Sequence, residues 1–157
     1  MPLTNEDLPQ TKTWGPQGRA GLPTHSLALL AGDACSHSHG IGVEFTAPGR
    51  SRLSMTVRPE MLNSHDICHG GIIFLLADTA LAYAANDGGA PVVSTGAQVH
   101  YLSPARVDDV LSADCEALHQ NAKSGLYDVT VTNQDGTVVA TLRGQSLRAR
   151  SLTPPAP

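Results

Sequence analysis

The sequence predicts an α+β domain in which one long helix packs against an antiparallel sheet. Residues 70–86 are the only segment that predicts a long helix. Shorter segments on both sides alternate apolar and polar residues, which is typical of strands with one buried face. Runs of strands with a single segregated helix indicate the α+β class.

The first half of the chain predicts a helix, a hairpin and the long helix. Residues 25–34 predict a short opening helix, and residues 41–48 and 52–60 predict a hairpin around the Pro48-Gly49 turn. The predicted helix is apolar nearly all round from Ile72 to Ala85. We therefore expect it to be almost fully buried.

The second half predicts three or four strands that follow one another as a meander. The pair Asp135-Gly136 is a strong hairpin signal between the last two. The strands are drawn from residues 92–103, 109–121, 125–134 and 137–149.

The chain of 157 residues is long enough for one domain with a proper core and short for two. Residues 1–24, rich in proline, glycine and polar residues, predict a mobile arm. Residues 25–150 form the domain, and residues 151–157 are a tail. The first 25 residues lack a signal pattern, and no apolar run approaches the ~18 residues of a membrane span.

Charge and cysteine content exclude several function classes. The formal net charge of −4 gives no general attraction to nucleic acid or to an anionic membrane. The three cysteines, Cys35, Cys68 and Cys115, lack a CxxC spacing, which argues against a disulfide framework or a zinc ribbon. These features predict a cytoplasmic protein in a reducing compartment.

Asp78 interrupts the apolar helix. A carboxylate in a buried helix is costly unless it is paired, hydrogen-bonded or functional. One interpretation is an acid at the helix edge that contacts solvent or a neighbouring strand. The other is a poorly solvated carboxylate that acts as a general base or as a nucleophile. Residue statistics alone leave both interpretations open.

His69 and Gly70 stand at the start of the same helix. The first turn of a helix carries unpaired N–H groups and the positive end of the helix dipole, so it favours an oxyanion. Gly70 would let a substrate carbonyl approach the backbone closely, as an oxyanion hole requires. The alternative is that Gly70-Gly71 is a tight turn and His69 an ordinary hydrogen-bonded residue.

Two other chemistries are disfavoured. Cys68 beside His69 would suggest a cysteine hydrolase, but adjacent residues near a helix start do not face each other, and no acid is placed to orient the pair. The sets CSHSH (residues 35–39) and HDICH (residues 65–69) contain metal-ligand types. Neither set has a HExxH or CxxC spacing, which disfavours a metal site.

The segment MLNSHDICHGGIIFLLADTALAYAAN resembles the hotdog-fold acyl-CoA thioesterases of the phenylacetate-degradation (PaaI) type. In that family an asparagine, a His-Gly-Gly at the helix start and a Leu-Ala-Asp follow at this spacing. The resemblance continues through VHYLSPARVDD, SGLYDVTVTNQDG and LRGQS and covers about residues 40–148. It implies a hotdog fold, in which a curved antiparallel sheet wraps a long central helix.

The resemblance also implies the activity, which is hydrolysis of an acyl-CoA thioester to free acid and CoA without a metal or redox cofactor. The implied acyl group is aromatic, of the phenylacetyl or hydroxyphenylacetyl type. Asp78 matches the catalytic carboxylate, and the Gly70 amide matches the oxyanion donor. His69 would hold the loop in shape and contact the carbonyl side, and Asn63 would position the thioester or the attacking water.

A hydroxyl from the strand after the helix commonly assists the carboxylate in that family, and Ser94 and Thr95 compete for this role. Thr95 shares a face with Val93, Ala97, Val99 and Tyr101, the apolar face that should meet the helix. Ser94 lies on the other face unless a bulge or register slip intervenes. Alternation therefore favours Thr95.

The family binds coenzyme A near basic and glycine-rich strand ends, which suggests substrate-binding candidates in addition to the catalytic residues. For the basic residues among them, a solvated surface charge is the alternative. The proline- and glycine-rich arm has no counterpart in the motif, so its role stays open. The candidates are Arg106, Lys123, Ser124, Gly125 and Arg143.

The spacing on the long helix has a consequence for assembly. Gly70 and Asp78 are eight residues apart, which separates them by about 12 Å at ~1.5 Å per residue. One chain therefore cannot bring both to the same carbonyl, whereas antiparallel helices of two copies can. We expect a homodimer or a dimer of dimers with shared sites. A non-catalytic acyl-CoA-binding protein and a hotdog hydratase remain as alternatives; the hydratase pattern places a histidine where Tyr83 stands.

Overall fold

The computed structural model describes residues 22–86 and 90–149. Two short helices open the described chain, α1 (Thr24–Gly32) and α2 (Ala34–His39). A hairpin of β1 (Gly42–Ala47) and β2 (Arg50–Thr56) and a 3-10 turn η2 (Pro59–Met61) lead to the long helix α3 (Gly70–Ala85). The remaining strands are β3 (Val92–Tyr101), β4 (Val110–Gln120), β5 (Ser124–Thr132) and β6 (Val138–Arg148).

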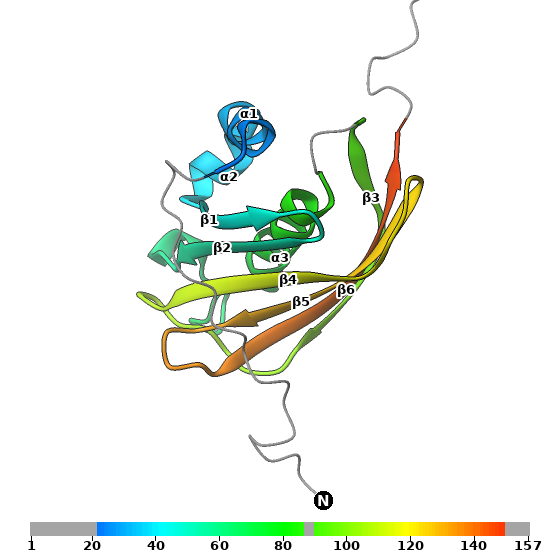
Figure 1. Ribbon diagram of the computed structural model, residues 1–157. Helices are drawn as coiled ribbons and strands as arrows, with labels where there is room; N and C mark the ends of the chain where they lie inside the picture. The colour runs from blue at the N-terminus through cyan, green and yellow to red at the C-terminus, as the bar shows by residue number, and fades with distance from the viewer. Residues whose placement is uncertain (1–21, 87–89, 150–157) are drawn as a thin grey trace, which may run out of the picture.

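The six strands form one antiparallel sheet in the order β1-β2-β4-β5-β6-β3. The sheet curves around α3, which lies against its concave side (Figure 1). The predicted α+β class and the long central helix are confirmed, as are the hairpins at Pro48-Gly49 and Asp135-Gly136. Gly136 adopts the left-handed backbone (φ 79°) that this turn signal requires.

The predicted meander is wrong for its first strand, because β3 pairs with β6 and not with β4. The connection after β3 explains this. The amides of Leu102 and Ser103 both donate to the Val139 carbonyl, and the Cys68 amide donates to the Ala105 carbonyl at 2.8 Å. The connection is thus tied to β6 and to the loop before α3, so it leads the chain away from β3 before β4 begins.

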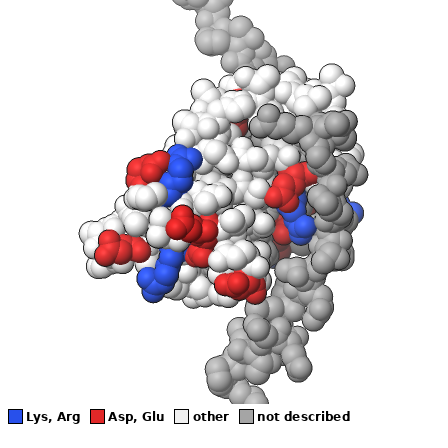
Figure 2. Space-filling model, turned by 90° about the vertical axis from the view of Figure 1, so that its left-hand side faces the viewer, with Lys and Arg blue, Asp and Glu red and all other residues white. Residues whose placement is uncertain are grey.

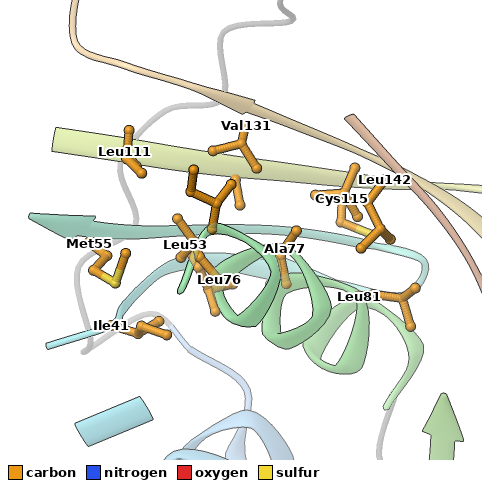
Figure 3. Close-up of a cluster of buried hydrophobic side chains, with 14 of the residues drawn as sticks. Ile41, Leu53, Met55, Leu76, Ala77, Leu81, Leu111, Cys115, Val131 and Leu142 are labelled. Carbon is orange, nitrogen blue, oxygen red and sulfur yellow. The ribbon is translucent and has the colours of Figure 1, made fainter. Parts of the chain in front are cut away.

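The core lies between α3 and the concave face of the sheet (Figure 3). Leu76, Ala77 and Leu81 of α3 are fully buried against strand residues such as Leu53. Gly144 on β6 permits the closest approach, because a Cβ there would collide with the Leu81 side chain. Other residues of this cluster are Met55, Leu111, Val131 and Leu142.

The helix is less buried than its composition predicted. Phe74, Leu75, Asp78 and Ala82 are only half-buried. These positions recur every three or four residues and therefore form one stripe along α3. The sheet covers the other sides of the helix, and the residues that the structure describes leave this stripe partly exposed.

The N-terminal segment forms two helices where the sequence predicted one. Leu22 and Leu30 are buried in the core, and α1 already begins at Thr24. Most of the predicted arm and the predicted tail lie outside the described residues. No helix within residues 22–86 and 90–149 is long and apolar enough to cross a membrane. On the face shown in Figure 2, acidic and basic side chains are interspersed and neither sign covers a broad area.

Candidate active site

The first turn of α3 is held by His69. The His69 Nδ1 atom accepts a hydrogen bond from the Gly71 amide at 3.0 Å, and the His69 carbonyl accepts from Ile72 at 2.9 Å. In the neutral ring the proton therefore lies on Nε2. Among the described residues no acceptor pairs with the Gly70 N–H. This amide, at the positive end of the helix dipole, is available to an oxyanion.

Tyr101 is a further candidate site residue, which the sequence motifs do not single out. Its hydroxyl donates to the Gly70 carbonyl at 2.9 Å. A Cβ at position 70 would lie 2.9 Å from Cζ of the tyrosine ring, so glycine is required there. Two side chains therefore hold the Gly70–Gly71 peptide group. Tyr101 binds its carbonyl oxygen, and His69 binds its N–H. Alternation places Tyr101 on the apolar face predicted to meet the helix, and only the fold shows that its hydroxyl reaches the helix start.

A cavity of about 530 Å³ lies beside this helix start. Asn63 stands at its wall in a tight loop, where its Oδ1 accepts from the His65 amide at 2.8 Å and its backbone amide donates to Ile67. The Asn63 side-chain NH₂ is the donor that this arrangement leaves for a ligand. The other lining residues are Ile67, Cys68, Gly70, Ile73, Tyr101, Leu102, Ser103, Pro104 and Ala105.

Cys68 lines the cavity but is a poor nucleophile. Burial raises the pKa of its thiol to about 11, so it is a neutral thiol near pH 7. This supports the sequence argument against a cysteine hydrolase. In the part of the chain that the structure describes, no group of three or more metal-ligating side chains gathers.

Asp78 lies half-buried in the middle of α3, and its partner is on β3. The Ser94 hydroxyl donates to Asp78 Oδ1 at 3.0 Å. Thr95 instead donates its hydroxyl to the Gln145 carbonyl on β6 at 3.3 Å. The prediction that Thr95 would face the helix is therefore wrong, and Ser94 occupies that place.

A β-bulge is the physical reason for this exchange. Ser94 pairs with Ser146, but the next paired residue is Gly96, opposite Gln145, so Thr95 is an extra residue on β3. An extra residue reverses the alternation of side chains before it. Ser94 therefore lies on the side of β3 that faces the helix, where its hydroxyl reaches Asp78.

The structure divides the predicted catalytic residues into two groups. Asn63, His69 and Gly70 gather at the start of α3, whereas Asp78 and Ser94 lie about two turns further along the same uninterrupted helix. Eight residues correspond to about 12 Å along the axis. Asp78 does not line the cavity beside Gly70. One chain therefore carries two separated half-sites.

The predicted coenzyme A residues do not converge within one chain. Arg106 precedes β4 and Lys123 follows it, and the 11 residues of β4 span about 35 Å. Arg143 forms a bidentate ion pair with Asp128, with both nitrogen–oxygen distances at 2.7 Å. This hydrogen bonding raises the pKa of the Arg143 guanidinium. Its charge is thus already compensated.

Lys123, Ser124 and Gly125 form a separate group at the turn between β4 and β5. The Asn121 side chain accepts from the amides of Lys123 and Ser124, which shapes this turn. Gly125 pairs with Ser146 on β6, and Ser146 pairs with Ser94 on β3. Gly125 therefore lies two strands, about 10 Å, from Ser94. This group belongs to the Asp78 end of the molecule.

A curved sheet around one central helix, with a His-Gly-Gly helix start and a carboxylate two turns along, defines a hotdog-fold protein of the thioester hydrolase class. Residues 65–140 match the model of the Thioesterase superfamily. The chain is also 40% identical over 121 residues to acyl-coenzyme A thioesterase PaaI of Escherichia coli (strain K12), covering 77% of this chain and 86% of that protein. It belongs to the thioesterase superfamily.

Solved structures agree with this assignment. The E. coli PaaI protein from the phenylacetic acid degradation operon superposes with a TM-score of 0.78 at 38% identity, over 80% of this chain and 91% of that chain. The protein smu.793 from Streptococcus mutans UA159, solved bound to acetyl CoA, superposes with a TM-score of 0.66 at 26% identity, over 69% of this chain and 88% of that chain.

Proposed function

We propose that this protein hydrolyses acyl-CoA thioesters to a free acid and CoA. The observation that carries the proposal is the pairing, on one helix, of an unpaired N-terminal amide at Gly70 with the half-buried, Ser94-bound carboxylate of Asp78. An amide suits the oxyanion of acyl transfer, and a carboxylate suits the attack on the thioester carbon. The E. coli relative carries the name of this activity.

The proposed roles follow from the contacts. The Gly70 N–H, assisted by the Asn63 NH₂, polarises the thioester carbonyl. Asp78 either takes a proton from the attacking water or attacks the carbonyl itself and forms an anhydride that water then cleaves. Ser94 orients the carboxylate. In both routes the C–S bond breaks, the sulfur leaves as CoA thiol, and no metal or redox cofactor takes part.

The proposed active form is a homodimer or a dimer of dimers, with each site shared between two chains. Strand β3 is a ten-residue edge of the sheet with exposed apolar side chains, including Val93 (37% exposed) and Tyr101 (50%). Long exposed edges are normally covered or paired. The described residues also leave the stripe of α3 that includes Phe74 and Asp78 only half-buried. A second copy on this surface would place its Gly70 beside Asp78.

The turn at Lys123, Ser124 and Gly125 is the proposed contact for the coenzyme A phosphates, because it lies at the Asp78 end and offers a free ammonium group. The S. mutans structure with acetyl CoA supports a CoA ligand for this fold. Arg106 and Arg143 are weaker candidates, since Arg106 lies beyond the far end of β4 and Arg143 is paired with Asp128. A reducing cytoplasm suits the three free cysteines.

An acyl-CoA panel assayed for thiol release tests both the thioester hydrolysis and the proposed aromatic acyl group. Arylacetyl thioesters such as phenylacetyl-CoA should show a higher kcat/KM than palmitoyl-CoA, as the family resemblance implies. A clear preference for palmitoyl-CoA would contradict the aromatic acyl group and leave hydrolysis intact. Saturable binding of acyl-CoA without any thiol release would instead favour a non-catalytic binding protein.

The bulge on β3 leads to a second prediction. Ser94→Ala should lower kcat about tenfold, because the Asp78 carboxylate loses a charge-assisted hydrogen bond. Thr95→Val, a matched control that removes the neighbouring hydroxyl, should change kcat less than about twofold. Steady-state thiol release measures both. The reverse ranking would show that Thr95 reaches the carboxylate in the working enzyme.

A further inference from the structure

Asn86 joins the end of α3 to the start of β3. It is the residue after the last helical position, and its backbone N–H donates to the Ala82 carbonyl at 3.0 Å. Its side-chain NH₂ donates to the same carbonyl at 2.8 Å and to the Val92 carbonyl at 3.1 Å. Its Oδ1 accepts from the Val92 amide at 2.9 Å.

These contacts engage both N–H groups and the oxygen of the Asn86 carboxamide. One N–H caps the helix, while the other N–H and the oxygen pair with both backbone groups of Val92, as a neighbouring strand residue would. Aspartate would lose both donors, and glutamine would place the amide one methylene further away. The residue type is therefore matched to a specific junction between helix and strand.

The junction joins the same two elements as the contact of the proposed catalytic carboxylate. Val92 is two residues before Ser94, and Asn86 directly follows the last residue of the helix that carries Asp78. The Ser94–Asp78 hydrogen bond spans the same two elements, α3 and β3. Among the described residues β3 pairs along one edge only, with β6, so its position against α3 depends on side-chain contacts such as this junction and, at the far end of the strand, the Tyr101–Gly70 hydrogen bond.

We propose that Asn86 is a positioning residue for the catalytic carboxylate. Its carboxamide sets the start of β3 against the end of α3, and this holds the Ser94 hydroxyl at hydrogen-bonding distance from Asp78. The inference rests on the proposed function, because it concerns the same carboxylate. Asn86 itself does not line the cavity beside Gly70.

A double-mutant cycle on the full-length enzyme tests this assignment. Asn86→Ala should lower kcat about tenfold and change KM less than about twofold, as expected when an oriented hydrogen bond to the carboxylate is lost. In the Ser94→Ala background the same substitution should change kcat less than about twofold, because the contact through which it acts is already gone. An equal factor in both backgrounds would overturn the proposal.

Asn133→Ala is the matched control. The Asn133 side chain also organises a turn, accepting from Asp135 at 3.1 Å and from Thr137 at 2.9 Å, but in the hairpin between β5 and β6. It should lower the Tm while leaving kcat unchanged. An equal loss of kcat in Asn86→Ala and Asn133→Ala would show that Asn86 acts through general stability and would overturn its positioning role.

Hydrogen–deuterium exchange gives a readout that is independent of turnover. Peptides covering residues 90–97 should exchange faster in Asn86→Ala than in the wild type, and Asn133→Ala should leave them unchanged. If the wild-type protein released no thiol from any acyl-CoA, that result would count against the proposed function. Unchanged exchange at residues 90–97 in Asn86→Ala would overturn the junction instead, so the two failures are distinguishable.

Discussion

Asp78→Ala is expected to lower kcat on the order of several hundredfold or more while the protein stays folded. The carboxylate is the only acidic group on α3, and it is held by Ser94 on the stripe of the helix that the described residues leave half-buried. Removing it eliminates either the base that activates water or the nucleophile. Asp78→Asn should be similarly inactive, because it keeps the size of the side chain and removes the charge.

Thiol release at saturating acyl-CoA measures the loss, and a thermal melt confirms that the variants fold. Asp114→Asn is the matched control, a half-buried carboxylate on β4 that pairs with Arg52 at 2.7 Å. It should keep wild-type turnover and lose at most modest stability. Turnover close to wild type in Asp78→Asn would remove the carboxylate from the mechanism.

Mixed dimers are expected to regain activity from two inactive parents. Asp78→Ala leaves the Gly70 half of each site intact, and Asn63→Ala leaves the carboxylate half intact. When the two variants are unfolded and refolded together in equal amounts, half of the dimers should be mixed. Each mixed dimer should hold one intact and one doubly damaged site. Statistical mixing therefore predicts about a quarter of wild-type activity for a site shared across a two-fold axis.

The control mixes Asp78→Ala with Asp78→Asn, in which every site lacks the carboxylate, so no activity should return. Subunit exchange is verified by mass spectrometry of differently tagged chains. A mixture of Asp78→Ala and Asn63→Ala that stays as inactive as its parents, with exchange proven, would rule out the shared site. The half-sites would then have to meet by a rearrangement within one chain.

Local features of the sequence were sufficient for much of the fold. The long helix from residue 70 and the hairpins at Pro48-Gly49 and Asp135-Gly136 were predicted because apolar periodicity and turn chemistry act over a few residues. The same holds for the two separated half-sites. A continuous helix has a fixed rise, so the spacing of Gly70 and Asp78 alone determines their distance.

Contacts between distant residues were decided only by the tertiary structure. The sequence does not show that β3 crosses to β6, because strand partners depend on where the connection after Tyr101 is anchored. Nor does it show the extra residue at Thr95, which turns Ser94 to the helix. A bulge depends on the register of two strands far apart in the chain, and strict alternation within one strand cannot predict it.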